Sequence, residues 1–372
     1  MTPQEKLKKI RDELRQTFLE RADLIDGALA ALLSSHHVLI VGPPGTAKSM
    51  LADEMCRRIE GANYFQWLLT RFTTPEEIFG AVSLKALEQD DYRRVTDHKL
   101  PQAHIAFLDE IFKANSSILN AILTLINERL FHNGKAVAPV PLLTLFGASN
   151  ELPEEEELTA LYDRFLVRFV VNYIAEDFRF LRMLESQAQA TRTSLTLSEL
   201  RELQEQVRNV AIPSHVYRSI ADIRRELNKK SIQASDRRYR QSLSLLQARA
   251  YLEGQQEVFE KDLFFLEHVL WRDPGEQEQV RSAIRELLLG YEEEITELLY
   301  ESREIKDSAC RSWETSDERA RALVEFHTKL RNILAKVDQV IEKAKRLGRP
   351  LDRVGSVRNE IEQIQKEMLE QF

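Results

Sequence analysis

The chain has 372 residues, enough for two or three domains with buried cores, and its 43% hydrophobic and 30% charged residues, with only 12 Gly and 11 Pro, exclude a disordered or fibrous protein. Its 60 Asp and Glu against 52 Lys and Arg give a formal net charge of −8, which argues against broad, nonspecific binding of nucleic acid. Neither Cys56 nor Cys310 lies in a Cys/His cluster of ligand spacing, so we expect two reduced thiols and no structural zinc site.

The N-terminal sequence lacks the apolar core of a signal peptide, and no later run approaches the roughly 20 apolar residues of a membrane span. We therefore expect no membrane span and a cytoplasmic location. From Leu7 to Leu32, apolar residues recur at spacings of three and four, which predicts one helical face that packs against another element.

Short apolar runs then alternate with helical patterns, such as those from Lys48 to Ile59 and from Ser117 to Leu130. Strands are expected at 38–41, 64–69, 105–108, 142–146 and 169–173. Such alternation predicts a mainly parallel sheet with helices on both faces.

After about Ala175 no strand pattern follows, and the sequence indicates helices that break near Pro213 and Gly254. Beyond Pro274, apolar steps of three and four predict three long antiparallel helices. We therefore expect an α/β domain at 1–175, an all-α domain at 176–275 and a three-helix bundle at 276–372.

The segment Gly42-Pro43-Pro44-Gly45-Thr46-Ala47-Lys48-Ser49 nearly matches the phosphate-binding loop G-x-x-x-x-G-K-[ST], with Ala47 in place of the second glycine. In such a loop, small residues let backbone N–H groups surround the phosphates, Lys48 neutralises the β and γ oxygens, and Ser49 ligates Mg²⁺. Ala47 fits if its φ stays negative. The alternative is a Gly/Pro turn followed by an ordinary lysine. On the first interpretation, ATP or ADP contacts Gly42, Pro43, Pro44, Gly45, Thr46, Ala47, Lys48, Ser49 and Met50.

The apolar run that starts at Ile105 ends in Asp109 and Glu110. At the carboxyl edge of a parallel sheet, this pair suits an Asp that binds metal and a Glu that polarises water. Alone, the pair would be better explained as a solvated strand end. Together with a phosphate loop about 60 residues upstream, it predicts a site for hydrolysis of a nucleotide.

The chain resembles an AAA+ ATPase of the MoxR group, close to its regulatory ATPase variant (RavA) branch, over roughly residues 5–275. The motifs are GPPGTAKS from Gly42, TRFTTPEEIFG from Thr70, FLDEIFK from Phe107, Asn127-Glu128-Arg129, and ASNELP from Ala148. Ala47 is usual in this group. The resemblance implies a P-loop AAA+ core, an all-α lid and a C-terminal helical bundle.

Further residue roles follow from the resemblance. Asn150 matches sensor 1, which positions the attacking water beside Glu110, although it could also be a turn-forming Asn. Arg164 matches the arginine finger that reaches the γ-phosphate of a neighbouring subunit, the alternative being a surface ion pair with Asp163. Arg237 matches sensor 2, with the adjacent Arg238 as a competitor.

Two further segments resemble insertions of this AAA+ clade. Asn133-Gly134, between extended stretches of 131–141, predicts a β-hairpin like the pre-sensor 1 hairpin. A second possible hairpin at 83–99, with Asp90-Asp91 near its tip, resembles the insert in helix 2. Both could instead be ordinary surface loops.

The resemblance implies a hexameric, Mg²⁺-dependent ATP hydrolase that remodels or assembles protein complexes with a von Willebrand factor A-domain partner. The C-terminal helices could dock that partner or form only a solvated bundle. Relatives in the variant branch carry a small β-rich insert for which this chain is too short. The rival functions are a DNA-acting motor, disfavoured by the net charge, and an ATP-dependent switch or scaffold of low turnover.

Overall fold

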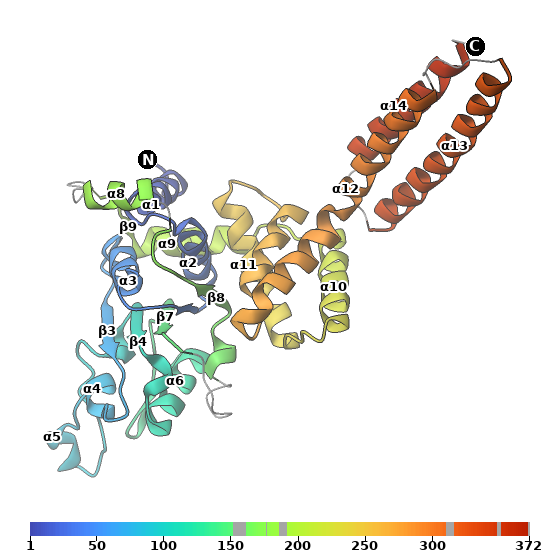
Figure 1. Cartoon of the computed structure of the whole chain (residues 1–372). Helices are drawn as coiled ribbons and strands as arrows, with labels where there is room; N and C mark the ends of the chain where they lie inside the picture. The colour runs from blue at the N-terminus through green and yellow to red at the C-terminus, as the bar shows by residue number, and fades with distance from the viewer. Residues whose placement is uncertain (152–160, 176, 186–191, 310–315, 348–350, 371–372) are drawn as a thin grey trace. The chain divides into compact units, whose positions relative to one another are not determined.

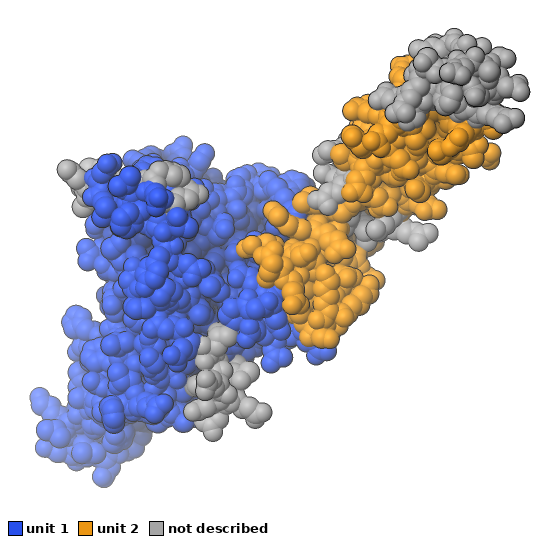
Figure 2. Space-filling view, in the orientation of Figure 1, with its two compact units in different colours: residues 1–212, 233–277 blue, residues 213–232, 278–372 orange. Residues whose placement is uncertain are grey.

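The computed structural model describes residues 1–151, 161–175, 177–185, 192–309, 316–347 and 351–370. These residues form two compact units, shown in different colours in Figure 2. The first unit comprises residues 1–212 and 233–277, and the second comprises residues 213–232 and 278–372. The boundaries expected at 175 and 275 stay a prediction, because compactness alone defines the two units.

The first unit contains a five-stranded parallel sheet, which confirms the predicted α/β core. Its strands in spatial order are β3 (Tyr64–Leu68), β4 (Ile105–Asp109), β7 (Thr144–Ser149), β1 (Val38–Val41) and β8 (Val167–Val170). The expected run 142–146 differs from β7 because Gly147, Ala148 and Ser149 continue the strand without large apolar side chains. All six residues of β7 are buried, as expected for an inner strand of a parallel sheet.

Helices α2 (Ala22–Ser34) and α3 (Lys48–Arg57) pack on the sheet, α2 against β1 and β8, and α3 against β3 and β4 (Figure 1). The single periodic face expected from Leu7 to Leu32 belongs to two helices, α1 (Pro3–Thr17) and α2. The chain turns between them, with Glu20 at φ 56°. The apolar spacing continues across this turn because α1 and α2 both bury their apolar side chains in the same unit.

The remaining elements of the first unit include two small strand pairs. Strand β2 (Ile59–Glu60) pairs with β9 (Leu195–Thr196), so the expectation of no strand after Ala175 is wrong at this short ladder. The helices are α4 (Pro75–Phe79), α5 (Leu84–Leu87), α6 (Ser116–Glu128), α8 (Asp177–Glu185), α9 (Leu197–Arg208) and α11 (Asp236–Leu252). The 3-10 helices are η1 (Leu100–Gln102), η2 (Ile111–Lys113), η3 (Glu260–His268) and η4 (Pro274–Glu276).

The hairpin predicted around Asn133-Gly134 is present as β5 (Leu130–Asn133) and β6 (Ala136–Pro139). Gly134 has φ 64°, and a Cβ there would lie 2.2 Å from Asp91 Oδ1. The expected second hairpin is wrong as a ladder, since one bridge joins Val82 and Arg94, and α5 occupies the intervening segment. Helix α5 forms because the Ser83 hydroxyl accepts a hydrogen bond from the Ala86 N–H.

The second unit contains α10 (Ser214–Lys229) and the three long helices α12 (Gln277–Ala309), α13 (Ser316–Leu347) and α14 (Asp352–Glu370). The long helices confirm the predicted C-terminal bundle (Figure 1). Their shared core consists of Tyr291, Ile295, Leu298, Phe326, Leu330, Ile333, Val337, Val340, Val354, Val357, Ile361, Ile364 and Met368. The part of this unit that the structure describes contains no strand, in line with the expected absence of a β-rich insert.

Two expectations about the whole chain can be compared with the described residues. None of the helices there combines the length and the apolar character needed to cross a membrane. Cys56 is a buried free thiol, and burial raises its pKa to about 11. Cys310 lies outside the described residues.

Acid is expected to destabilise the first unit through two histidines that precede β1. His37 Nδ1 accepts a hydrogen bond from the Leu145 N–H at 3.1 Å. Burial and the Arg129 guanidinium hold the pKa of His37 well below its usual range, and burial lowers the pKa of His36 to about 4. Unfolded histidines titrate near 6.5, so the unfolded chain binds more protons than the native chain at mildly acidic pH. The stabilisation is therefore present above about pH 6.5 and is lost as the pH falls toward 4.

Urea unfolding at several pH values between about 7 and 5 measures this effect as the slope of the unfolding free energy, to which each histidine contributes up to about 1.4 kcal/mol per pH unit. The His37→Gln variant should lower that slope by an amount equivalent to nearly one bound proton, because glutamine does not titrate. Its side-chain oxygen can still accept the hydrogen bond from the Leu145 N–H. A variant slope equal to that of the native sequence would contradict the assignment to His37.

Candidate active site

The predicted phosphate loop, residues 42–49, joins β1 to α3 at the carboxyl edge of the sheet. The Gly42 N–H donates to Ser149 O at 3.0 Å, which ties the loop to the end of β7. A Cβ at Gly42 would lie 2.2 Å from Val171 O, so only glycine fits there. Gly45 has φ 79° and open space around it, and its lack of a side chain permits this backbone conformation.

Ala47 corrects one expectation, because its φ is +63° and not negative. A left-handed alanine costs about 1 kcal/mol relative to glycine, so the loop stores local strain at this position. Ala47 is the N-cap of α3 and makes no side-chain cap hydrogen bond. The N–H groups of the first turn of α3 therefore lack a side-chain cap, as suits an anion at a helix N-terminus.

Lys48 lies between the loop and the carboxylates of β4. Its Nζ donates to Gly42 O at 2.6 Å and to Pro43 O at 3.0 Å, and the side chain is buried. Burial lowers the pKa of Lys48, whereas the charges of Asp109 and Glu110 oppose this shift. The structure thus brings the lysine and both predicted acidic residues together at one edge of the sheet.

Glu110 follows β4 in a strained conformation with φ 51°, which is uncommon for a residue other than glycine. Its Oε1 accepts a hydrogen bond from Asn150 Nδ2 at 2.7 Å, and Lys113 Nζ lies 3.2 Å from Oε2. Asp109 Oδ1 accepts from the Glu110 N–H at 3.1 Å. Asn150 and Glu110 meet because β4 and β7 are neighbouring parallel strands whose carboxyl ends share an edge.

The donor set at this edge fits Mg²⁺ bound together with a triphosphate. Ser49 is half-buried in the first turn of α3, and Asp109 ends β4. Among the described residues, no group of three or more His, Cys, Asp or Glu side chains could hold a metal. Mg²⁺ commonly takes only one or two protein ligands and completes its shell with phosphate oxygens and water, so Ser49 and Asp109 suffice.

The remaining residues predicted to contact the nucleotide differ in burial and in their contacts. The Thr46 hydroxyl donates to Pro43 O at 3.0 Å and so braces the loop internally. Pro44 and Met50 are exposed. Contact of these residues with a nucleotide stays a prediction.

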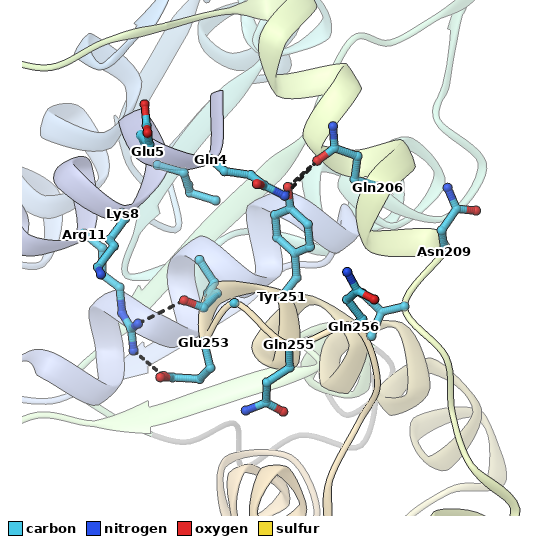
Figure 3. A pocket seen from close by; sticks show the side chains of 14 residues that line it. Gln4, Glu5, Lys8, Arg11, Gln206, Asn209, Tyr251, Glu253, Gln255 and Gln256 are labelled. Atoms are coloured by element: carbon cyan, nitrogen blue, oxygen red, sulfur yellow. Dashed lines mark hydrogen bonds and ion pairs between the residues drawn. The ribbon is translucent and has the colours of Figure 1, made fainter. Parts of the chain in front are cut away.

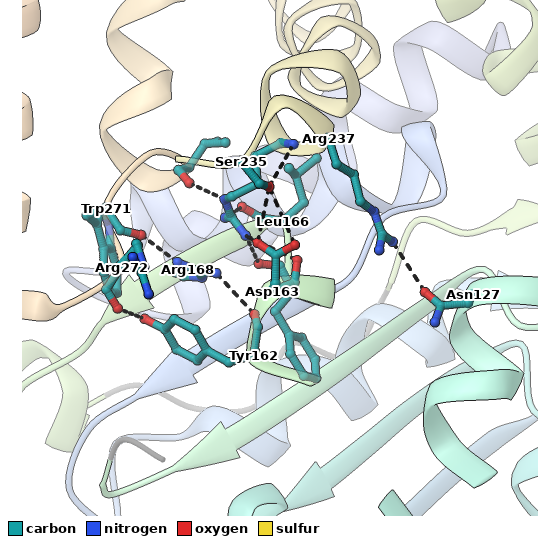
Figure 4. A network of polar contacts seen from close by, with 12 residues as sticks. Asn127, Tyr162, Asp163, Leu166, Arg168, Ser235, Arg237, Trp271 and Arg272 are labelled. Atoms are coloured by element: carbon teal, nitrogen blue, oxygen red, sulfur yellow. Dashed lines mark hydrogen bonds and ion pairs between the residues drawn. The ribbon is translucent and has the colours of Figure 1, made fainter. Parts of the chain in front are cut away.

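Arg237 and Arg238, which the sequence could not separate, have different environments, and Figure 4 shows Arg237 directed toward Asn127. Arg237 is half-buried near the start of α11, and its Nη2 donates to Asn127 Oδ1 at 3.2 Å. Arg238 is only 1% exposed, and its guanidinium is bound to backbone carbonyls. Of the two, only Arg237 has a side chain available to a ligand.

Arg164 lies in the helical residues 161–164 and is half-buried. Its Nε is buried and has no hydrogen-bond partner among the residues that the structure describes. The alternative ion pair with Asp163 is wrong, because the Asp163 carboxylate faces Arg238, with Oδ1 3.5 Å from Nη1. A half-buried arginine whose Nε has no acceptor among the described residues is compatible with an acceptor on another chain.

Two residues near the site had no role assigned from the sequence: Lys113, the ion-pair partner of Glu110, and Asn127, the partner of Arg237. Both stand inside motifs that carry the family resemblance, FLDEIFK and Asn127-Glu128-Arg129. Their position in those motifs was the sequence feature that could have indicated a role at the site.

A separate hollow of about 710 Å³ lies in the first unit, and none of the predicted site residues lines it (Figure 3). In its wall, Gln206 Oε1 accepts from Gln4 Nε2 at 3.1 Å and from the Tyr251 hydroxyl. Arg11 lies at one side and pairs with Glu253 and the buried Asp26. These hydrogen bonds and ion pairs join α1 to α9 and α11.

Family models and known proteins are similar to this chain. Residues 5–206 match the family model described as the MoxR domain in the MoxR-vWA-beta-propeller ternary systems, and residues 215–284 match an AAA lid domain. An uncharacterized protein of Methanocaldococcus jannaschii is 38% identical over 370 residues, which cover 97% of this chain and 98% of the relative. Chaperone MoxR1 of Mycobacterium tuberculosis is 30% identical over 166 residues, 43% of each chain.

Among solved structures, a protein of Cytophaga hutchinsonii described as a candidate ATPase is similar with a TM-score of 0.62 and 16% identity. The match covers 77% of this chain and 94% of that protein. At this identity, the likeness supports the fold.

Proposed function

The chain belongs to the MoxR family of AAA+ ATPases, and we propose that it hydrolyses ATP at the subunit interfaces of a hexameric ring to remodel or assemble protein complexes. The observation that carries the proposal is the hydrogen bond from Asn150 to Glu110, which lies at the sheet edge where Lys48 also faces the acidic pair. This constellation provides a phosphate cradle, a metal ligand and a base in one place.

In the proposed mechanism, the backbone of the loop and the first turn of α3 hold the phosphates, and Lys48 balances their charge. Mg²⁺, held by Ser49 and Asp109, would neutralise charge on the β and γ oxygens. Glu110 accepts a proton from the attacking water through a carboxylate oriented by Asn150. Arg237, at the start of α11, is the proposed sensor 2 residue, and Arg164 acts on the nucleotide of the neighbouring subunit.

The proposed partner is a protein with a von Willebrand factor A domain. This rests on the matched family, whose description names ternary systems of MoxR, vWA and β-propeller proteins. On the same basis, a β-propeller protein is the proposed third component of the assembly. The sequence motifs favour the RavA-like branch within the family. The described C-terminal residues contain no strand, so the proposal includes no function that depends on a β-rich insert.

Lys48→Ala is expected to weaken ATP binding by at least about a hundredfold, because it removes a lysine that contacts the loop and interacts with the charges of the acidic pair. Isothermal titration with ATP and Mg²⁺ measures the change. Lys9→Ala removes the same charge from an exposed position on α1 and is the matched control. Unchanged affinity in Lys48→Ala would refute the phosphate-loop assignment.

Pull-down of bound proteins tests whether the ATPase acts on protein complexes. Glu110→Gln protein with bound ATP should retain the vWA-domain partner and its client in pull-downs from the native cell, and Lys48→Ala protein should not. Stimulation of turnover by DNA at physiological salt would favour a DNA-acting motor instead.

A further inference from the structure

Phe72 is a large apolar residue that the first unit leaves almost fully exposed. It is 90% exposed, and Leu68, at the end of β3, is 56% exposed. Phe72 lies in the short connection between β3 and α4 (Figure 1). It belongs to the motif TRFTTPEEIFG, which has no role in the proposed mechanism. A surface that covered both residues would gain free energy from the apolar area removed from water.

The turn that carries Phe72 is held by several hydrogen bonds. The Thr73 N–H donates to Thr70 O at 3.1 Å, so Arg71 and Phe72 occupy the two central positions of a β-turn. The Thr70 N–H donates to Thr73 Oγ1 at 2.8 Å, and the Phe72 N–H donates to Thr70 Oγ1 at 3.2 Å. From outside the turn, Asn115 Nδ2 donates to Thr73 O at 3.0 Å. A side chain presented by such a fixed backbone loses little backbone entropy on binding, which suits an anchor in an interface.

The exposed pair lies beside the candidate active site. Leu68 is the register partner of Asp109 in the neighbouring strands β3 and β4, which places the two residues about 5 Å apart across the sheet. The Leu69 N–H donates to Asp109 O at 2.9 Å, just before the turn begins. Asn115, which braces the turn, is the N-cap of α6 and follows Glu110 in the chain. Both Leu68 and the turn therefore belong to the carboxyl edge of the sheet.

Arg164 lies at the opposite edge of the same sheet. Strands β1 and β8 are parallel, with Val38 paired to Val167. Arg164 precedes β8 and so lies at the amino edge, whereas Lys48 follows β1 at the carboxyl edge. A strand of four residues spans about 13 Å, and three strand spacings of about 4.8 Å separate β8 from β4. One arginine side chain does not bridge that separation, so Arg164 reaches Glu110 only in another copy of the chain.

A neighbour that brings Arg164 to Glu110 has to place its own surface over the carboxyl edge, where Leu68 lies level with Asp109. We propose that Phe72 and Leu68 form the apolar anchor against which this second copy of the chain packs. The inference rests on the proposed function, which carries the finger across the interface but assigns no residue that holds the two subunits together. It gives the exposed turn of the TRFTTPEEIFG motif a role in assembly.

The test is sedimentation velocity over a range of protein concentrations in ATP and Mg²⁺, with Glu110→Gln in every protein so that the nucleotide is not consumed. Phe72→Ser should raise the concentration at which half of the subunits are assembled by about tenfold to a hundredfold, because burial of an exposed phenylalanine contributes about that factor to association. Leu68→Ser should raise it less, since Leu68 is already partly covered. A midpoint for Phe72→Ser within about twofold of the unsubstituted protein would overturn the proposal.

Turnover distinguishes an anchor from a residue that takes part in the chemistry. With Glu110 intact, Phe72→Ser should hydrolyse ATP slowly at concentrations where the native protein is assembled, and should recover at about tenfold to a hundredfold higher concentration. Its ATP affinity, measured where both proteins are unassembled, should equal that of the native protein. Slow turnover by assembled Phe72→Ser rings would also overturn the anchor role, because association would no longer be what the variant lacks.

Matched variants separate loss of the apolar contact from general damage. Val324→Ser removes another exposed apolar side chain, 68% exposed on α13 of the second unit, and should leave assembly and turnover unchanged. Phe72→Leu keeps an apolar side chain at the turn and should assemble at a concentration between those of the native protein and Phe72→Ser. Assembly of Phe72→Leu that is as weak as that of Phe72→Ser would contradict an apolar anchor.

Arg164→Ala separates failure of this inference from failure of the proposed function. If Arg164→Ala leaves turnover unchanged, the finger is wrong, and the anchor proposed for its interface is wrong with it. If Arg164→Ala loses turnover while Phe72→Ser changes neither assembly nor turnover, only the anchor is wrong. Loss of turnover in Arg164→Ala together with weakened assembly in Phe72→Ser supports both.

Discussion

Glu110→Gln is expected to lower the rate of ATP hydrolysis by about 10² to 10⁴ while ATP binding is retained. Glutamine preserves the size of the side chain, and its carbonyl oxygen can still accept the hydrogen bond that Asn150 Nδ2 gives to Oε1 at 2.7 Å. What it loses is the ability to take a proton from water. The phosphate loop and Lys48 remain in place, so the nucleotide has the same contacts as before.

The measurement is steady-state release of phosphate together with ATP affinity by titration. Glu151→Gln is the matched control, because it neutralises an exposed carboxylate two residues after β7, at the same edge of the sheet. Its turnover should stay within about twofold of the native protein. Turnover in Glu110→Gln that falls less than about threefold would assign the base to another group.

Much of the sheet could be predicted because buried parallel strands consist of short apolar runs bounded by turn residues. Strand β1 is such a run, and it leads directly into the glycines and prolines of the loop. The end of strand β7 could not be predicted in this way, because Gly147 to Ser149 are small and carry no apolar run. They are buried because neighbouring elements cover them. Hydrophobic periodicity also could not locate the turn after α1, since the residues on both sides of it face one core.

The site was predictable where its chemistry is local in sequence, as in the loop at 42–49 and the pair Asp109-Glu110. Tertiary contacts decided the rest. Ala47 was expected at negative φ from its residue type alone, yet the connection between β1 and α3 holds it at +63°. Adjacent arginines on a helix point about 100° apart, so only the positions of distant carbonyls determine that Arg238 is buried and Arg237 is not.

Arg164→Ala is expected to reduce turnover by about 10³ to 10⁵ with little change in ATP affinity. The side chain has no acceptor for its buried Nε among the described residues of its own chain, and the backbone on either side is fixed by Arg168 and Arg238. A cation held in this way suits the charge that develops on a phosphoryl group of another subunit. Arg164→Lys should restore only part of the rate, because an ammonium cannot reproduce the planar fork.

Mixing distinguishes a finger that acts across an interface from one that acts within its subunit. Glu110→Gln subunits lack the base but supply Arg164, and Arg164→Ala subunits supply the base but lack the finger. In rings of equal proportions, an Arg164→Ala site that faces a Glu110→Gln neighbour has both groups, so about a quarter of native turnover should return from two inactive proteins. If Arg164 acted on its own nucleotide, every site in the mixed ring would lack one of the two groups and no activity would return.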